Sequence, residues 1–155
     1  MNYQDLDSPI GRIRMVSDGE HLTAIQFGNV KSTTITGNER SDPTLKACSQ
    51  QLKEYFAGKR RNFELPLSPS GTPFQQRVWD SLKAIPYGEL RSYRDIAEGL
   101  HKPKAVRAVG AANGRNPLPI VVPCHRVIGS NGSLTGFSGG LETKRILLKL
   151  EGAID

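Results

Sequence analysis

The sequence has few of the features that mark secreted, membrane-spanning or metal-stapled proteins. It holds two cysteines and three histidines in 155 residues, and none of them forms the paired spacings of zinc or redox sites. No apolar stretch approaches the roughly 20 residues that span a bilayer, and residues 1–10 carry two aspartates where a secretory signal would be basic and then apolar. We therefore expect free thiols, no metal, no membrane association, and a location in the cytoplasm, or in the nucleus of a eukaryote.

A hydrophobic content of 37% in a chain of this length is enough for a packed core, which excludes collagen-like, fibrous and wholly disordered proteins. The net charge of +6 is concentrated in one segment, because residues 1–70 hold nine basic and eight acidic side chains. Residues 91–126 contain two acidic side chains against seven basic ones: Arg91, Arg94, Lys102, Lys104, Arg107, Arg115 and Arg126. Such a patch favours a polyanionic partner such as nucleic acid, although a basic, solubilising surface is the alternative.

The first part of the chain predicts a small sheet and one helix. Residues 10–16 and 22–27 alternate apolar and polar side chains and are separated by turn residues, which is typical of antiparallel hairpins. Asp42 and Pro43 then begin a helix whose apolar stripe contains Cys48, so we interpret this cysteine as a buried structural thiol. Residues 63–67 predict another strand, and the turn-rich segment after it divides the chain into lobes 1–70 and 71–155.

The second lobe opens with a predicted helix over residues 73–85, capped by Thr72, and continues with a helix-turn-helix candidate over residues 92–113. Ser92 and Asp95 have the capping-box spacing, and Pro103 suits the first position of the second helix. The spacing then turns Ala105, Ala108, Val109 and Ala112 inward and leaves Lys104, Arg107 and Ala111 outward. With two long exposed side chains, this helix suits close approach to DNA better than base reading, while an ordinary helical hairpin stays possible.

The segment 116–129 contains the residues best suited to chemistry. Its prolines and β-branched run predict a buried strand or extended stretch that ends at Cys124. His125 and Arg126 follow, and both could favour the thiolate. Because neighbours on a strand face opposite ways, His125 would reach the thiol only through a bend or a water. A buried thiol beside a surface histidine is the alternative.

A small-residue segment and a last helix complete the chain. Residues 135–140 suit a loop that wraps a flat ligand, or else a flexible connector. The helix predicted over residues 141–150 is followed by Glu151, an acid at an end where the helix dipole disfavours it, which indicates a partner elsewhere in the fold.

Residues 123–129, Pro-Cys-His-Arg-Val-Ile-Gly, resemble the active-site signature of the O6-alkylguanine-DNA alkyltransferases, the methylated-DNA–protein-cysteine methyltransferases. Supporting motifs occur in the family's order at residues 85–89, 92–93, 105–110, 116–117 and 138–141. The resemblance covers about residues 72–152. It implies an α/β protein with a ribonuclease-H-like sheet lobe at the N-terminus and a mainly helical, winged-helix-like lobe with a helix-turn-helix.

The resemblance also implies a role for each site residue. Cys124 would accept the alkyl group, His125 would deprotonate it through a water, Glu151 would orient the histidine and Asn116 would brace the active-site loop. Tyr93 would crowd the neighbouring phosphate and donate a proton to the leaving base. Arg107 would enter the base stack. The other DNA-binding residues would be Ser92, Tyr93, Arg94, Lys104, Ala105, Ala108 and Arg115. The base pocket would comprise Val121, Val122, Pro123, Phe137 and Ser138.

The sequence departs from the family pattern at two points. Phe137 stands where members often have tyrosine, and the zinc ligands of some members have no counterparts in residues 1–70. The expected function is single-turnover repair of O6-alkylguanine in duplex DNA, with O4-alkylthymine as a second candidate substrate, by a monomer without cofactor. The alternatives are a helix-turn-helix DNA-binding or lesion-sensing module in which Cys124 is structural, and a thiol hydrolase that turns over repeatedly.

Overall fold

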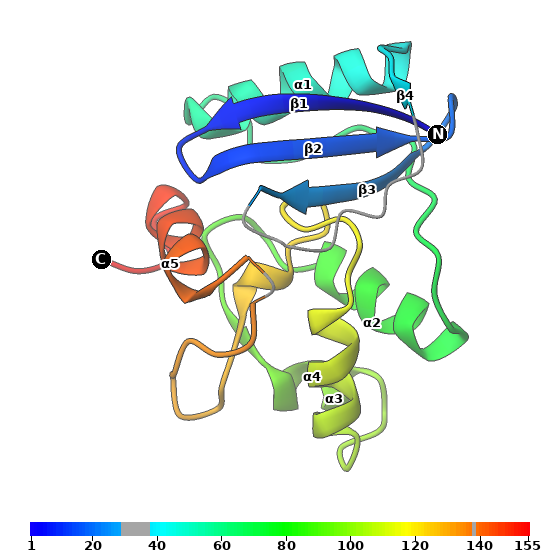
Figure 1. Cartoon of the computed structure of the whole chain (residues 1–155). Helices are drawn as coiled ribbons and strands as arrows, with labels where there is room; N and C mark the ends of the chain where they lie inside the picture. The colour runs from blue at the N-terminus through cyan, green and yellow to red at the C-terminus, as the bar shows by residue number, and fades with distance from the viewer. Residues whose placement is uncertain (29–37, 138) are drawn as a thin grey trace. The chain divides into compact units, whose positions relative to one another are not determined.

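The computed structural model describes residues 1–28, 38–137 and 139–155, which divide into two compact units, Met1–Ser70 and Gly71–Asp155 (Figure 1). The first unit is a four-stranded sheet of order β3-β2-β1-β4 with one helix. Its strands are β1 (Asn2–Ser8), β2 (Gly11–Ser17), β3 (Leu22–Phe27) and the short β4 (Asn38–Glu39). The first three pair antiparallel and β4 pairs parallel to β1. The alternation of side chains predicted β2 and β3, which form an antiparallel hairpin.

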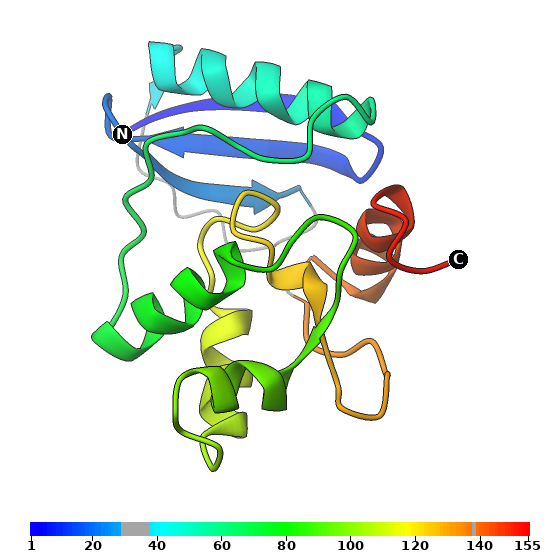
Figure 2. The same cartoon turned by 180° about the vertical axis from the view of Figure 1, so that it is seen from behind.

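The helix α1 (Pro43–Phe56) covers one face of this sheet, as the view from behind makes plain (Figure 2). Asp42 caps it by accepting the Leu45 amide at 2.8 Å. The other carboxylate oxygen of Asp42 accepts from Asn2 and Ser17, so the cap also fixes the helix against β1 and β2. Cys48 is fully buried in the core of this unit, as its place on the apolar stripe predicted.

The predicted strand over residues 63–67 is wrong. This stretch makes a single bridge, between Leu22 and Leu67, in which the Leu22 amide donates to the Pro66 carbonyl at 2.7 Å. Pro66 has no amide hydrogen, so a regular ladder cannot continue through it.

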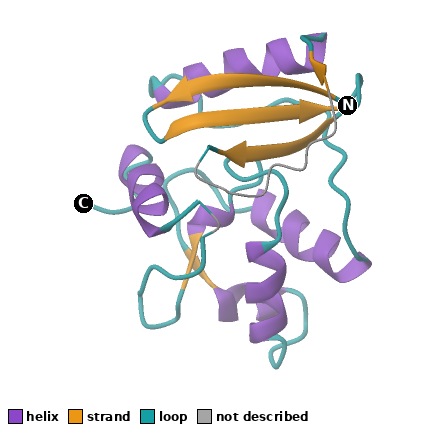
Figure 3. Cartoon of the chain, viewed as in Figure 1, coloured by secondary structure: helices purple, strands orange, loops and turns teal. Residues whose placement is uncertain are grey.

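The second unit is mainly helical, with one short parallel strand pair (Figure 3). Its helices are α2 (Pro73–Lys83), α3 (Tyr93–Gly99), α4 (Val106–Gly114) and α5 (Leu141–Leu150), and one 3₁₀ turn, η1, covers Cys124–Arg126. The strand pair is β5 (Arg91–Ser92) beside β6 (Val127–Ile128). Thr72 and Gln75 form a capping box at the start of α2, and the Trp79 indole of α2 donates to the Ala112 carbonyl of α4 at 2.9 Å. No helix in the described part of the chain has the length and apolar content to cross a bilayer.

The helix-turn-helix is present, but its second helix starts later than predicted. The turn includes His101 at a φ of 60° and extends through Ala105, so Pro103 precedes α4, which begins at Val106. The buried stripe of α4 is therefore Val109, Ala112 and Asn113, and the predicted inward position of Ala108 is wrong because this residue is exposed. The outward positions of Lys104, Arg107 and Ala111 are confirmed.

The start of α2 generates a stability prediction. A Cβ added at Gly71 would lie 2.4 and 2.6 Å from two ring carbons of the buried Trp79, whereas a Cβ at Gly99, on α3, would meet nothing within 4 Å. Gly71→Ala should lower the free energy of unfolding by about 1–3 kcal/mol through overpacking, while Gly99→Ala should be neutral or stabilising by up to about 1 kcal/mol. Urea unfolding measures both, and equal midpoints for the two variants would contradict the close packing of Gly71 on Trp79.

Candidate functional site

The chain reaches Cys124 through a turn that the side chain of Asn116 holds in place. The Asn116 amide donates to the Val122 carbonyl at 2.8 Å, and its oxygen accepts the Leu118 amide at 2.9 Å. The Val122 carbonyl also accepts the Cys124 amide at 2.8 Å, across Pro123 with φ −80° and ψ 66°, the geometry of an inverse γ-turn. Asn116 is itself buried, so the position of the thiol is tied to the end of the α4 segment.

The predicted strand or extended stretch leading to Cys124 is wrong. Ile120 has a φ of 75°, which reverses the chain, and the Val122 amide then bonds back to the Leu118 carbonyl at 2.8 Å. A β-branched residue in this region is a steric outlier that only the surrounding contacts can hold. Because Cys124 and His125 lie in the 3₁₀ turn η1, the strand argument that places their side chains on opposite faces does not apply.

His125 is fully buried and is held by the residue that follows α5. Its Nε2 lies 2.7 Å from Glu151 Oε2, and both side chains are inaccessible to solvent. Its Nδ1 is buried without a hydrogen-bond partner among the described residues. An imidazole that donates through Nε2 to a carboxylate carries a free lone pair on Nδ1, which is the arrangement of a general base.

Arg126 is placed differently from both sequence-based expectations. It was expected to act as a cation beside the thiol and as part of the basic surface, but the residue is 5% exposed. Its Nε and Nη2 donate to the two oxygens of Glu151 at 2.8 and 3.1 Å, and its Nη1 donates to the Ile85 carbonyl at 2.7 Å. Its charge is thus neutralised inside the fold and unavailable to a phosphate.

Lys144 is a site residue that the sequence analysis missed. It is buried on α5, where its Nζ donates to the carbonyls of Val127, in β6, and Thr135. The Thr135 carbonyl also accepts the Tyr93 hydroxyl at 3.0 Å. Lys144, Leu147 and Leu148 share the buried stripe of α5, so helical spacing could have found this lysine.

Burial dominates the protonation of the site. It raises the pKa of the Cys124 thiol to about 11, against the opposing effects of the Asn116 hydrogen bond and the Lys144 ammonium. Burial also lowers the pKa of His125, although Glu151 acts in the opposite direction, and it lowers the pKa of Lys144 to about 8. The resting site at neutral pH therefore contains a neutral thiol and a neutral imidazole, and the expected resting thiolate is not favoured.

Most of the remaining predicted residues lie on the helix-turn-helix or directly before the thiol in the chain. Ser92 caps α3 by accepting the Asp95 amide at 3.0 Å, which puts Tyr93 at the first position of the helix. Four basic side chains are exposed, namely Arg94, Lys104, Arg107 and Arg115, together with Ala108, while Ala105 is half-buried. Of the predicted base pocket, Val122 and Pro123 are buried, Val121 and Phe137 are half-buried, and Ser138 lies outside the described residues.

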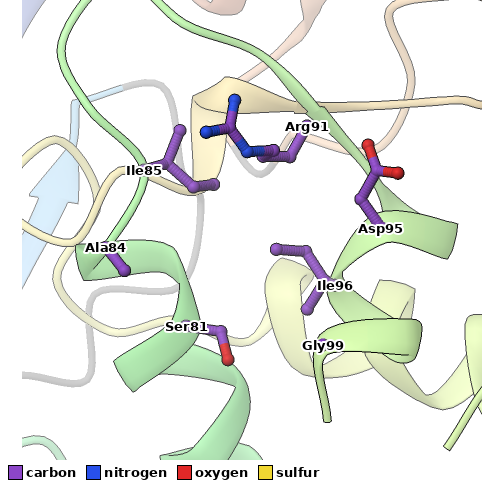
Figure 4. A pocket seen from close by; sticks show the side chains of 7 residues that line it. All are labelled: Ser81, Ala84, Ile85, Arg91, Asp95, Ile96 and Gly99. Carbon is purple, nitrogen blue, oxygen red and sulfur yellow. The ribbon is translucent and has the colours of Figure 1, made fainter. Parts of the chain in front are cut away.

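A separate hollow of about 590 Å³ lies between α2, β5 and α3 (Figure 4). Its lining includes Ile85, Arg91 and Asp95 but none of the residues that surround the thiol. Among the described residues, no group of three histidine, cysteine or acidic side chains could hold a metal ion.

The protonation of Cys124 gives a prediction that needs no substrate. In a Cys48→Ala background, which removes the other thiol with its pKa of about 12, thiolate absorbance should appear with a midpoint near pH 11. The physical reason is that a charged sulfur is disfavoured in a buried position. A midpoint below pH 8 would contradict this description of the resting site.

Comparisons with known proteins agree on one family over both units. Residues 1–69 match the model of the 6-O-methylguanine DNA methyltransferase ribonuclease-like domain, and residues 73–153 match that of the DNA binding domain of the same protein. The chain is 48% identical to a methylated-DNA–protein-cysteine methyltransferase of Methanosarcina acetivorans, with 99% of each chain covered. It is also 48% identical to a constitutive one of Bacillus subtilis, with 96% of this chain and 94% of that one covered.

Among solved structures, the Mycobacterium tuberculosis OGT in complex with DNA matches with a TM-score of 0.91 and 46% identity, covering 99% of this chain and 94% of that one. These matches confirm the fold class expected from the sequence, a small sheet lobe followed by a mainly helical lobe. The chain belongs to the 6-O-methylguanine DNA methyltransferase family.

Proposed function

We propose that this protein repairs duplex DNA by moving the alkyl group of O6-alkylguanine onto Cys124, once per molecule and as a monomer without cofactor. The observation that carries the proposal is the buried neutral thiol at the end of a braced turn, next to an imidazole whose Nδ1 is unpartnered and whose Nε2 is held by Glu151. The relatives named as methylated-DNA–protein-cysteine methyltransferases and the DNA complex of the M. tuberculosis protein support it.

The reaction balances with groups that this chain supplies. His125 takes the thiol proton on Nδ1, directly or through a water, and the sulfur attacks the alkyl carbon in line with the bond to O6. The carbon–oxygen bond breaks, its electron pair stays on the guanine, and a carbon–sulfur bond forms. The base then needs one proton, which Tyr93 can supply because burial raises the pKa of its hydroxyl and keeps it protonated. Solvent restores the proton to tyrosine and removes the one on histidine.

The product explains why each molecule acts once. A thioether offers no good leaving group, and none of the groups placed at the site would cleave it. A hydrolase built on the same thiol and imidazole would pass through an ester that water removes, so it would turn over. Stoichiometric transfer therefore separates the proposal from that alternative.

The exposed arginines and lysine of the helix-turn-helix suit the phosphate backbone. Arg126 is neutralised by Glu151 and Arg91 is paired with Glu89, and the exposed charges of this patch include Arg94, Lys104, Arg107 and Arg115. Phosphate contacts of this kind hold a protein on DNA without reading its sequence. Selectivity then follows from the smaller cost of unpairing a damaged base, which must leave the stack to reach a buried thiol.

Intact-protein mass measurement after incubation with duplex DNA containing O6-methylguanine tests the proposal. The protein should gain the mass of one methyl group and no more, and peptide mapping should place it on Cys124. Cys124→Ala should abolish the gain while DNA binding is kept, and Cys48→Ala should change neither. Transfer to Cys48, or release of product without modification of the protein, would overturn the proposal.

Arg107, the second residue of α4, generates a prediction about base extrusion. Its side chain is exposed and would fill the space left in the base stack. Arg107→Ala should slow repair of duplex DNA at least tenfold but leave the reaction with free O6-benzylguanine nearly unchanged, because a free base needs no extrusion.

Arg145→Ala is the matched control, since Arg145 is an exposed arginine on α5 that pairs with Glu142. It should affect neither substrate. Equal losses on duplex and free base for Arg107→Ala would show that Arg107 acts on the site itself instead of on the DNA.

A further inference from the structure

The guanidinium of Arg126 makes three kinds of contact in a position closed to solvent. Its side chain is 6% exposed, and its forked donors match both oxygens of Glu151. The third nitrogen binds the Ile85 carbonyl, in the segment after α2, and the group lies 5.7 Å from the centre of the Tyr87 ring. A bidentate pair of this kind fixes both the position and the rotation of the carboxylate.

The same carboxylate is the partner of His125. Glu151 Oε2 lies 2.7 Å from His125 Nε2 and also accepts Arg126 Nη2 at 3.1 Å, while Oε1 accepts Arg126 Nε and the Gly88 amide at 3.5 Å. A buried carboxylate with histidine as its sole partner would draw a proton onto the imidazole to obtain a counter-charge. Here a permanently charged group already provides that counter-charge.

Of the other charged groups near His125, Lys144 acts in the same direction as Arg126 and Glu151 acts in the opposite direction. Glu151 favours the imidazolium, whereas the Lys144 ammonium and Arg126 both oppose it, and Cys124 is a neutral thiol at rest. Burial lowers the pKa of His125 further. The base function of His125 depends on this balance, because a protonated imidazole cannot accept the thiol proton.

We propose that Arg126 is a positioning residue that compensates Glu151 and thereby keeps His125 a neutral base, with its proton on Nε2 and a free lone pair on Nδ1. The proposal rests on the proposed function, since it concerns the same site. It assigns to Arg126 a role different from contact with DNA or with the thiol. The carboxylate orients the imidazole, and the guanidinium prevents the carboxylate from charging it.

NMR titration of the full chain labelled with ¹⁵N-histidine tests this without any transfer reaction. His125 is distinguished from His21 and His101 by the loss of its signals in His125→Gln. The wild-type protein should show a neutral Nε2–H tautomer at pH 7. Arg126→Met should move the His125 midpoint above pH 7, and Arg126→Met with Glu151→Gln should bring it back down because both charges are then removed.

The rate of alkyl transfer from free O6-benzylguanine, measured as a function of pH, should change with the His125 midpoint of each variant. In Arg126→Met, the transfer rate should fall about tenfold at pH 7 and should recover as the pH is raised past the new His125 midpoint. The reason is that, below the midpoint, one pH unit changes the fraction of neutral His125 about tenfold. Arg145→Met, an exposed arginine on α5, should match the wild type. A residue that only supported the fold would lower the rate at every pH alike.

Arg126→Gln removes the charge but keeps hydrogen-bond donors that can reach Glu151 and Ile85. It can replace Arg126→Met in both measurements if that variant does not fold. An unchanged His125 midpoint in a folded charge-removed variant would overturn the inference. Because the NMR midpoint needs no substrate, this outcome is distinct from a failure of the proposed function, which would appear as no methyl transfer by the wild-type protein.

Discussion

The buried carboxylate of Glu151 is the interaction on which the arrangement of the thiol site depends. It stands at the C-cap of α5 and joins three separate segments, because it binds the side chains of His125 and Arg126 in η1 and the amide of Gly88. An anion at a helix C-terminus is unfavourable in isolation, and the guanidinium beside it offsets that cost. Removing the carboxylate or the guanidinium alone would leave an uncompensated charge in the interior. These two groups and the imidazole of His125 therefore form one unit.

The second constraint is the burial of the thiol itself. A thiol whose pKa is about 11 costs about 5 kcal/mol to ionise at pH 7, so a thiolate is not maintained at rest. In the proposed reaction, the nucleophile becomes available when neutral His125 accepts the thiol proton as a substrate alkyl group is presented. A neutral buried thiol is also a poor target for oxidants, which attack thiolates. This protection suits the proposed transfer, in which the cysteine is used only once.

Local signals in the sequence were sufficient to predict the starts of three helices and several residues of the site. Asp42, Thr72 and Ser92 predicted the starts of α1, α2 and α3 because a cap acts through hydrogen bonds within one turn. The misplaced acid at Glu151 correctly indicated a partner elsewhere in the fold. The family motif identified Cys124, His125 and Asn116 as candidates, and the structure brings them together with Glu151.

The wrong predictions share a cause, because in each case tertiary contacts outweighed the local conformational or burial preference of the residues. The β-branched run before Cys124 favours a strand, but Asn116 and the positive φ of Ile120 turn it back on itself. Pro103 is suited to a helix start, yet the turn through His101 delays α4 by three residues. Arg126 was expected in the basic surface patch and Lys144 was not singled out, because charged residues are usually solvated. The burial of Arg126 depends on Glu151, and that of Lys144 on the carbonyls of Val127 and Thr135.

The most direct measurement of the central claim compares two pH midpoints in one protein, the Cys48→Ala variant. The first is the ionisation of Cys124 seen by thiolate absorbance, and the second is the rate of alkyl transfer from free O6-benzylguanine. If neutral His125 is the base, transfer should be level from neutral pH upward and fall only at acid pH, below the ordinary histidine value of 6.5, far from the thiol midpoint near 11. A transfer rate that instead rises in parallel with the thiolate, with one shared midpoint, would contradict the account.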